Sequence, residues 1–225
     1  MPQAEQKLEQ AIARRPWLGL ALSLMVAMLA LLLFAGIADS VLDQKTHSFD
    51  LQIRVAVHRH AWPQLTMAMQ AVTWLGSWQV LLPAVCCLLV IFILRGRSHE
   101  ARLLLLTILG AEVLDTVLKL SFRRARPAPF FNIAPLHTYS FPSGHALVSF
   151  CFYGLIAGLI TLRVRSKWLQ AIVWLVTIAI VGLIGFSRIY LGLHYASDVI
   201  AGYMAAIFWM GASKVLSRSN KLVRT

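Results

Sequence analysis

The sequence has few charged residues and very few acidic ones. Charged residues make up 13% of the 225 residues, only nine are aspartate or glutamate, and hydrophobic residues make up 59%. Water-soluble domains carry about 25% charged residues. The shortage of charge therefore excludes a soluble domain and indicates a membrane protein. The shortage of carboxylates also leaves little from which to build a magnesium or two-metal site.

Cysteine is scarce as well. Cys86 and Cys87 fall inside one apolar run and Cys151 inside another. Such positions are typical of small residues within a membrane, and they favour neither a disulfide framework nor a thiol-phosphatase site. His58 and His60 could form part of a metal site, but no third ligand accompanies them, so we interpret them as part of a solvated loop. We predict no metal and no other cofactor.

Basic residues outnumber acidic ones, 21 against nine, which gives a formal net charge of +12. In a soluble protein this excess would suggest nucleic acid. Here the lysines and arginines lie in the tails and in short loops between apolar segments, where such residues set membrane topology. We therefore expect no nucleic-acid partner.

Apolar segments of about 20 residues, the length of a membrane-spanning helix, recur along the chain. We predict a single all-α domain over residues 1–225, an integral membrane bundle of six transmembrane helices, near residues 18–38, 77–95, 101–120, 146–162, 168–186 and 197–214. The first span is too long for a signal-peptide core, so we expect a retained anchor. Residues 39–76 are mixed and amphipathic, and we place them at the outward membrane surface.

The distribution of lysine and arginine predicts the orientation. More of them lie in the tails, including residues 1–17, and in the second and fourth loops than in the other loops. By the positive-inside rule both termini then face the cytoplasm, and the third and fifth loops face outward.

Three short motifs share this outward face. They are "KLSFRRARP", which begins at Lys119, "PSGH", which ends at His145, and "SRIYLGLHYASD", which ends at Asp198. Each motif lies at a predicted helix end on the outward side. A six-helix bundle with this connectivity can therefore bring residues from the whole range 119–198 together.

The cations of these motifs favour a phosphate-like anion. Lys119, Arg126 and Arg188 supply positive charge, and arginine donors match phosphate oxygens in pairs. The backbone N–H groups of Ser143 and Gly144, with that of the following histidine, would lie at a helix N-terminus, where anions are stabilised.

The histidines suit phosphoryl transfer. His194 and Asp198 are spaced i, i+4, so on a helix they share a face, and the carboxylate could hold Nδ1–H while Nε2 acts as the nucleophile. His145 could protonate the leaving oxygen and later activate water. The cations would stabilise the charge of the transferring group, so the chemistry needs no metal.

Taken together, the motifs resemble the three signatures of the type 2 phosphatidic acid phosphatase superfamily, the lipid phosphate phosphatases: K-x6-R-P, P-S-G-H and S-R-x5-H-x3-D. The resemblance extends over roughly residues 70 to 212 and implies a six-helix membrane fold and metal-independent hydrolysis of phosphate esters. It also implies a phosphohistidine at His194, with Asp198 as its partner and His145 as the acid. The phosphate ligands that it implies are Lys119, Arg126, Ser143, Gly144 and Arg188.

The chain resembles bacterial members that act on phosphatidylglycerol phosphate, phosphatidic acid or undecaprenyl diphosphate. This implies a multi-pass protein of the bacterial cytoplasmic (inner) membrane, with the active site facing the periplasm or cell exterior, and partners limited to the bilayer and a lipid phosphate substrate. The short third loop, 121–141, offers few residues for headgroup recognition: Phe130, Phe131, Asn132, His137 and Tyr139. For His137, substrate contact and simple exposure are both open.

Two other functions use the same residues. A lipid phosphotransferase would pass the phosphoryl group to a second lipid instead of water, and a transporter or non-catalytic protein would only bind the anion. The related vanadium haloperoxidases are soluble, which argues against their chemistry here. Glu112 and Asp115 share a helix face with Lys119, and we expect Asp115 to pair with it at i, i+4, as a supporting residue and not as a phosphate ligand.

Overall fold

The described part of the chain is helical throughout. The computed structural model describes residues 16–222, with side chains over 18–216, and no strand occurs within that range. Its helices are α2 (Pro16–Leu42), α3 (His47–Arg59), α4 (Pro63–Trp74), α5 (Trp78–Leu94), α6 (Ser98–Phe122), α7 (Gly144–Thr161), α8 (Lys167–Tyr190) and α9 (Ala196–Leu222). The all-α prediction is confirmed, and each predicted span corresponds to one long helix. The rest of the predicted tail, residues 1–15, lies outside the described residues.

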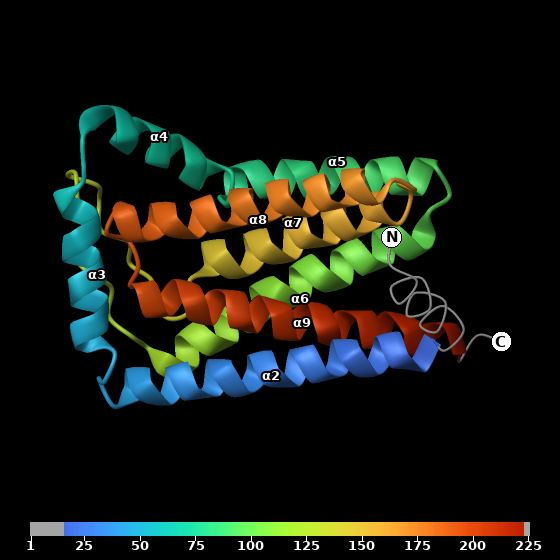
Figure 1. Ribbon diagram of the computed structural model, residues 1–225, viewed down its shortest axis with the longest axis horizontal. Helices are drawn as coiled ribbons and strands as arrows, with labels where there is room; N and C mark the ends of the chain where they lie inside the picture. Colours follow the sequence, from blue (N-terminus) through green and yellow to red (C-terminus); the bar gives the residue numbers. More distant parts are fainter. Residues whose placement is uncertain (1–15, 223–225) are drawn as a thin grey trace.

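The long helices run side by side, and two short helices close one end (Figure 1). α3 stands across the ends of the long helices, and α4 leads obliquely back to α5. The segment predicted to be amphipathic, 39–76, is therefore the end of α2 followed by two helices. His58 was predicted to lie in a solvated loop, and this was wrong, because the residue lies on α3. The segment has helical periodicity. The imidazole ring of His58 stacks on the ring of Phe130, with 3.9 Å between the ring centroids.

Five stretches of the described residues are long and apolar enough to cross a membrane: Leu18–Leu42, Pro63–Leu94, Gly144–Thr161, Lys167–Tyr190 and Ala196–Leu216. The helix α6 is long enough but is not among them, because Glu112, Asp115 and Lys119 interrupt its apolar character. The chain is thus a multi-pass membrane protein, and the count of six spans stays a prediction.

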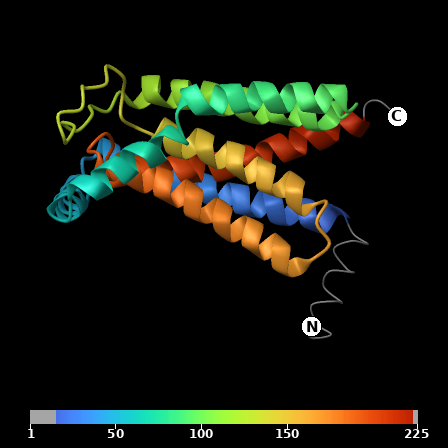
Figure 2. The ribbon, with the colours of Figure 1, turned by 90° about the horizontal axis from the view of Figure 1, so that it is seen from above.

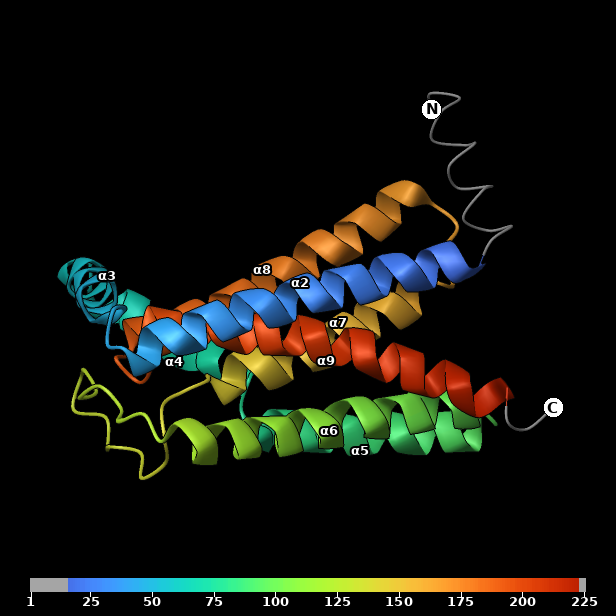
Figure 3. The ribbon, with the colours of Figure 1, turned by 90° about the horizontal axis from the view of Figure 1, so that it is seen from below.

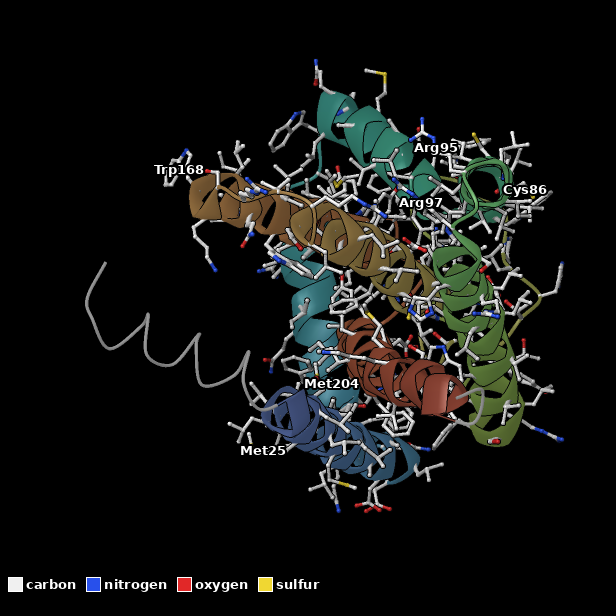
Figure 4. The ribbon with its side chains drawn as sticks, turned by 90° about the vertical axis from the view of Figure 1, so that its right-hand side faces the viewer. Met25, Cys86, Arg95, Arg97, Trp168 and Met204 are labelled. Carbon is white, nitrogen blue, oxygen red and sulfur yellow. The ribbon has the colours of Figure 1, made fainter. Side chains whose placement is uncertain are left out.

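The two ends of the bundle carry different parts of the chain. At the end away from α3, the turn between α5 and α6 carries Arg95 and Arg97, and α8 begins near Trp168 (Figure 4). Helix α2 begins and α9 ends at this same end (Figure 1). The other end carries α3 and the irregular segment 123–143 (Figure 2). This separation is the one that the topology prediction requires, although which end faces the cytoplasm stays a prediction.

The helices converge near the α3 end and spread apart toward the other, most visibly α8 from α5 and α6 (Figure 3). Small residues permit the close approach, as is common between helices in membranes. A Cβ on Gly202 of α9 would lie 2.7 Å from the carbonyl oxygen of Ser143, and a Cβ on Gly185 of α8 would lie 2.0 Å from the hydroxyl of Tyr203. The start of α7 is therefore pressed against α9, and α9 is pressed against the end of α8.

The core follows from this convergence. One buried cluster joins α2, α5, α6, α7 and α9, and a smaller one packs Met69 of α4 against Tyr190 and Leu193. Cys151 is buried in the larger cluster, whereas Cys86 and Cys87 lie on the outer surface of α5, where Figure 4 labels the first of them. This surface is part of a predicted span, so the cysteines keep the positions expected of residues facing lipid.

Candidate active site

The start of α7 ties the second motif to the third. Ser143 caps the helix, since its hydroxyl oxygen accepts from the backbone N–H of Ala146 at 3.5 Å. The backbone N–H of Ser143 donates to the carbonyl oxygen of Asp198 at 2.9 Å. The N-terminus of α7, with its backbone donors, is thus fixed next to the first turn of α9.

His194 lies just before α9, next to the contact between α7 and α9, and its side chain is only 2% exposed. Its Nδ1 lies 3.4 Å from Oδ2 of Asp198, and its Nε2 lies 2.9 Å from Nη1 of Arg126. A guanidinium can only donate hydrogen bonds, so Nε2 accepts and the ring proton is on Nδ1, facing the carboxylate. The sequence argument assumed that both residues share a helix. In fact α9 begins at Ala196, and the pair meets because Oδ2 also accepts from the backbone N–H of Tyr195 at 2.9 Å.

The surroundings of His194 keep its imidazole neutral. Burial lowers the pKa of His194 well below its usual value, and the nearby charges of Arg126, Arg188 and Lys119 lower it further. A neutral ring whose Nε2 carries a lone pair is the form that can attack phosphorus.

Arg126 is held by the loop that it belongs to and by the residue before His194. Its Nη1 also donates to the carbonyl oxygen of Leu193 at 2.9 Å, while Nε and Nη2 donate to the carbonyl and hydroxyl oxygens of Thr138 at 2.7 and 2.8 Å. The guanidinium is therefore aimed at the imidazole before any ligand binds.

Arg188 approaches from the end of α8 and is 5% exposed. Its Nη1 donates to the hydroxyl of Thr73 on α4 at 2.8 Å, and its buried Nε has no hydrogen-bond partner within the described residues. A buried donor without an acceptor costs about 1–3 kcal/mol. An anion placed beside it would remove that cost.

Lys119 forms the predicted pair with Asp115, with Nζ 2.5 Å from Oδ2. Gly144 makes room for this pair, because a Cβ there would lie 2.9 Å from Nζ and 2.8 Å from Oδ2. The other carboxylate oxygen, Oδ1, is buried and has no partner within the described residues. Lys119 of the first motif thus lies directly against Gly144 of the second motif.

A cavity of about 450 Å³ opens beside these groups, between α5, α6 and α7. His145, which is half-buried, lines it together with Lys119, Asp115 and Glu112. The remaining walls lie further along α5 and α6 from this end and are apolar; they include Trp78, Leu81, Leu82, Val85, Leu105, Ile108 and Leu109. The cavity therefore joins a polar end at the site to an apolar wall on α5 and α6.

The loop residues predicted to read the headgroup divide into two groups. Phe130 and Phe131 pack onto the scaffold: the first ring stacks on His58 and lies 4.4 Å from the guanidinium carbon of Arg54, and the second stacks on Tyr190 at 5.4 Å. The others are exposed, namely Asn132, His137 and Tyr139. Within the described residues no group of histidine, cysteine and acidic side chains could hold a metal ion.

Sequence reasoning missed several residues that contact the site. Arg124 lies between the two cationic residues selected from the first motif, and it donates to both Asp198 and Asp50. Ser140 donates to Asp198, and Thr73 accepts from Arg188. The only sequence signal was that Asp50 is one of nine acidic residues in a chain poor in them.

The sequence of the chain is similar to those of known proteins. The sequence profile of the PAP2 superfamily matches residues 100–221. Phosphatidylglycerophosphatase B of Bacillus subtilis is 31% identical over 177 residues, which are 76% of this chain and 85% of that protein. An undecaprenyl-diphosphatase of Sulfolobus acidocaldarius is 36% identical over 107 residues, 45% of this chain and 47% of that protein.

Two solved structures have folds similar to that of this chain. The crystal structure of a transmembrane PAP2-type phosphatidylglycerolphosphate phosphatase from Bacillus subtilis superposes with a TM-score of 0.78 and 26% identity, covering 86% of this chain and 96% of that one. The crystal structure of Aquifex aeolicus LpxE superposes with a TM-score of 0.57 and 28% identity, covering 73% and 94%.

Proposed function

Because the chain belongs to the PAP2 superfamily, as its three motifs predicted, we propose that it removes a phosphoryl group from a membrane lipid by way of a phosphohistidine. The chain is a lipid phosphatase, in keeping with its relatives. The observation that carries the mechanism is the placement of His194, whose Nδ1 faces Asp198 and whose Nε2 faces Arg126.

In the first step, Nε2 of His194 attacks phosphorus, and the bond between phosphorus and the leaving oxygen breaks. Phosphate oxygens replace Nε2 as the acceptors of Arg126, so the cation follows the charge of the transferring group. His145 gives its proton to the leaving oxygen. Asp198 stabilises the positive charge that develops on the ring of His194.

In the second step, water attacks the phosphohistidine and the bond between phosphorus and Nε2 breaks. His145, now neutral, accepts the proton of that water. Lys119, Arg188 and the N–H groups of Ser143 and Gly144 bind the remaining oxygens through both steps. Inorganic phosphate leaves, and the starting protonation states return.

The cavity supports a lipid substrate over a soluble one, because its polar end adjoins His145 and its walls further along α5 and α6 are apolar. The substrate classes that we propose are phosphatidylglycerol phosphate, phosphatidic acid and undecaprenyl diphosphate. We place the protein in the bacterial cytoplasmic membrane with this site facing outward, on the basis of the lysine and arginine distribution.

The test is phosphate release by the purified protein in detergent from each of these lipids and from a soluble ester. We expect release from at least one lipid, no effect of a metal chelator, and inhibition by orthovanadate. His194→Ala should abolish release and acid-labile labelling of the protein, whereas His60→Ala removes an exposed imidazole just after the end of α3 and should change neither.

Other outcomes would contradict the proposal. Transfer of labelled phosphate to a second lipid without free phosphate would indicate a phosphotransferase, and tight binding without turnover would indicate an anion-binding protein. Acid-labile labelling that persists in His194→Ala would remove this residue from its role.

A further inference from the structure

An arginine outside the proposed set of phosphate ligands holds two buried carboxylates at the edge of the site. Arg124 follows α6, and its Nη1 lies 2.5 Å from Oδ1 of Asp198 while its Nη2 lies 2.7 Å from Oδ2 of Asp50. Both carboxylate side chains are fully buried, and the arginine side chain is 15% exposed. The planar guanidinium suits this task, because its fork presents donors to two acceptors at once.

Asp50 brings α3 into the same network. Its Oδ1 accepts from the backbone N–H of Ser197 at 2.9 Å, and its Oδ2 accepts from the Ser197 hydroxyl at 2.6 Å. That hydroxyl in turn accepts from Nη1 of Arg124 at 2.8 Å. The first turn of α9 is therefore attached to α3 immediately before Asp198.

The two oxygens of Asp198 accept hydrogen bonds from different partners. Oδ2 accepts from Nδ1 of His194, from the backbone N–H of Tyr195 and from the hydroxyl of Ser140. Oδ1 accepts from Nη1 of Arg124. The terminal torsion of an aspartate is soft, so a partner on each oxygen is needed to fix the plane of the carboxylate. Arg124 thereby works with Tyr195 and Ser140 to keep Oδ2 pointed at the imidazole.

Arg124 also supplies the charge that this region needs. Asp50 and Asp198 bind the same guanidinium, and a buried carboxylate that loses its cation is strongly disfavoured in the ionised form. The ring of Tyr195 covers the guanidinium, whose carbon lies 4.3 Å from the ring centroid. The arginine is thus enclosed by the network and is placed to keep Asp198 ionised.

We propose that Arg124 and Asp50 are positioning residues that act on the nucleophile His194 through Asp198. The inference rests on the proposed function, because it assigns these residues to the phosphohistidine step. It makes α3 part of the catalytic apparatus, although α3 lies outside the residues 100–221 that match the superfamily.

The experiment compares Arg124→Gln, Arg124→Lys and Asp50→Asn with the control Arg123→Gln in steady-state phosphate release. Arg123 is the exposed neighbour, and its Nε donates to the carbonyl oxygen of Leu120. We expect kcat of Arg124→Gln to fall about 100-fold, the loss typical of a reacting group displaced by about 1 Å, with KM within about twofold of wild type. Arg124→Lys should recover part of the loss, Asp50→Asn should lose less, and the control should match wild type.

The pH profile separates positioning from a merely structural role. Asp198 contacts two groups that carry or can carry charge. One is Arg124, which also binds Asp50 of α3. The other is His194, which also contacts Arg126. Without the positive charge of Arg124, Asp198 takes up a proton more readily, so the acid limb of kcat should move to higher pH in Arg124→Gln. A structural role would reduce the fraction of active protein and leave both the pH profile and KM unchanged.

Each result decides the inference. It is wrong if Arg124→Gln turns over like the control, or if kcat falls with an unmoved pH profile and no recovery in Arg124→Lys. If Arg124→Gln does not yield folded protein, Arg124→Lys and Asp50→Asn decide it by the same two readouts. Failure of the wild-type protein to release phosphate from any lipid would instead overturn the proposed function.

Discussion

The two buried carboxylates beside the site belong to regions that are built differently. Asp198, on α9, has partners on both oxygens, drawn from the loop after α6 and from residues around the start of α9. Asp115, on α6, pairs with Lys119 through one oxygen, and its other oxygen is buried without a partner in the described part of the chain. The Asp198 region is therefore complete before substrate arrives, whereas the Asp115 region still has hydrogen-bonding capacity to offer a ligand.

This difference agrees with the positions of the two regions. Asp198 adjoins His194, the nucleophile that we propose, and a nucleophile gains from a partner fixed in advance. Asp115 lines the cavity, next to a cation that we expect to exchange its protein partner for phosphate. The three predictions below test the contrast, from the largest expected effect to the smallest.

Asp198→Asn should reduce kcat by about 10⁴-fold, the effect of the same change in the serine-protease triad. The amide cannot stabilise the imidazolium, and its NH₂ group can turn toward Nδ1 and favour the wrong tautomer. Phosphate release under saturating lipid measures the loss. Asp43→Asn, which removes a carboxylate from an exposed pair with Lys45, is the control. A loss below tenfold would show that the Asp198 region is no more critical than the Asp115 region.

Asp115→Asn should act on binding and not on chemistry. Releasing Lys119 from its partner makes the cavity more positive, so we expect KM to fall by up to about fivefold, which is about 1 kcal/mol, the upper end of the range for a single ion pair that water can reach. The fall should be larger for a diphosphate than for a monophosphate lipid, with kcat nearly constant. Glu112→Gln removes the same charge one turn further from Lys119 and should have the smaller effect. A large loss of kcat instead would place Asp115 in the chemical step.

Acid should destabilise the Asp198 region through His194. Burial and the neighbouring cations hold its pKa below the ordinary value of about 6.5. Below pH 6.5 the unfolded chain therefore binds a proton that the folded chain does not, so stability is full above this pH and is lost as the pH falls. At pH 5.5 the loss is on the order of 1 kcal/mol.

The measurement is the thermal midpoint at pH 7.5 and pH 5.5, for wild type and for His194→Asn. The asparagine variant lacks this titration, so its midpoint should fall less on acidification. Equal falls in the two proteins would show that the imidazole of His194 does not resist protonation.

Much of the site could be predicted because it is local in the chain. The Asp115–Lys119 pair is spaced i, i+4 on one helix, and helical geometry alone brings the two together. The start of α7 at Gly144 follows from a serine cap before an apolar run. The helical character of α3 was missed because the segment was judged by its mixed composition, and mixed composition is also typical of a short helix at a surface.

The partners of Arg124 could not be predicted. This residue lies 74 positions from both Asp50 and Asp198 in the sequence. Three arginines occur close together in the first motif. The K-x6-R-P spacing selects Arg126, but nothing in the sequence says which of the other two faces inward and which faces water. Arg123, one residue earlier, has a left-handed backbone with φ of 47° and an exposed side chain, and this turn of the chain sends its neighbour inward.

The sequence by itself determined that the chain is an apolar helical protein with a cationic site at one end, because composition, helix length and motif spacing are properties of neighbouring residues. The tertiary structure alone decided that Asp50 of α3 contacts the start of α9 and that α5 and α6 line the cavity. These contacts depend on how closely the helices converge, and that distance is set by small residues such as Gly202 and Gly144 meeting partners from distant helices.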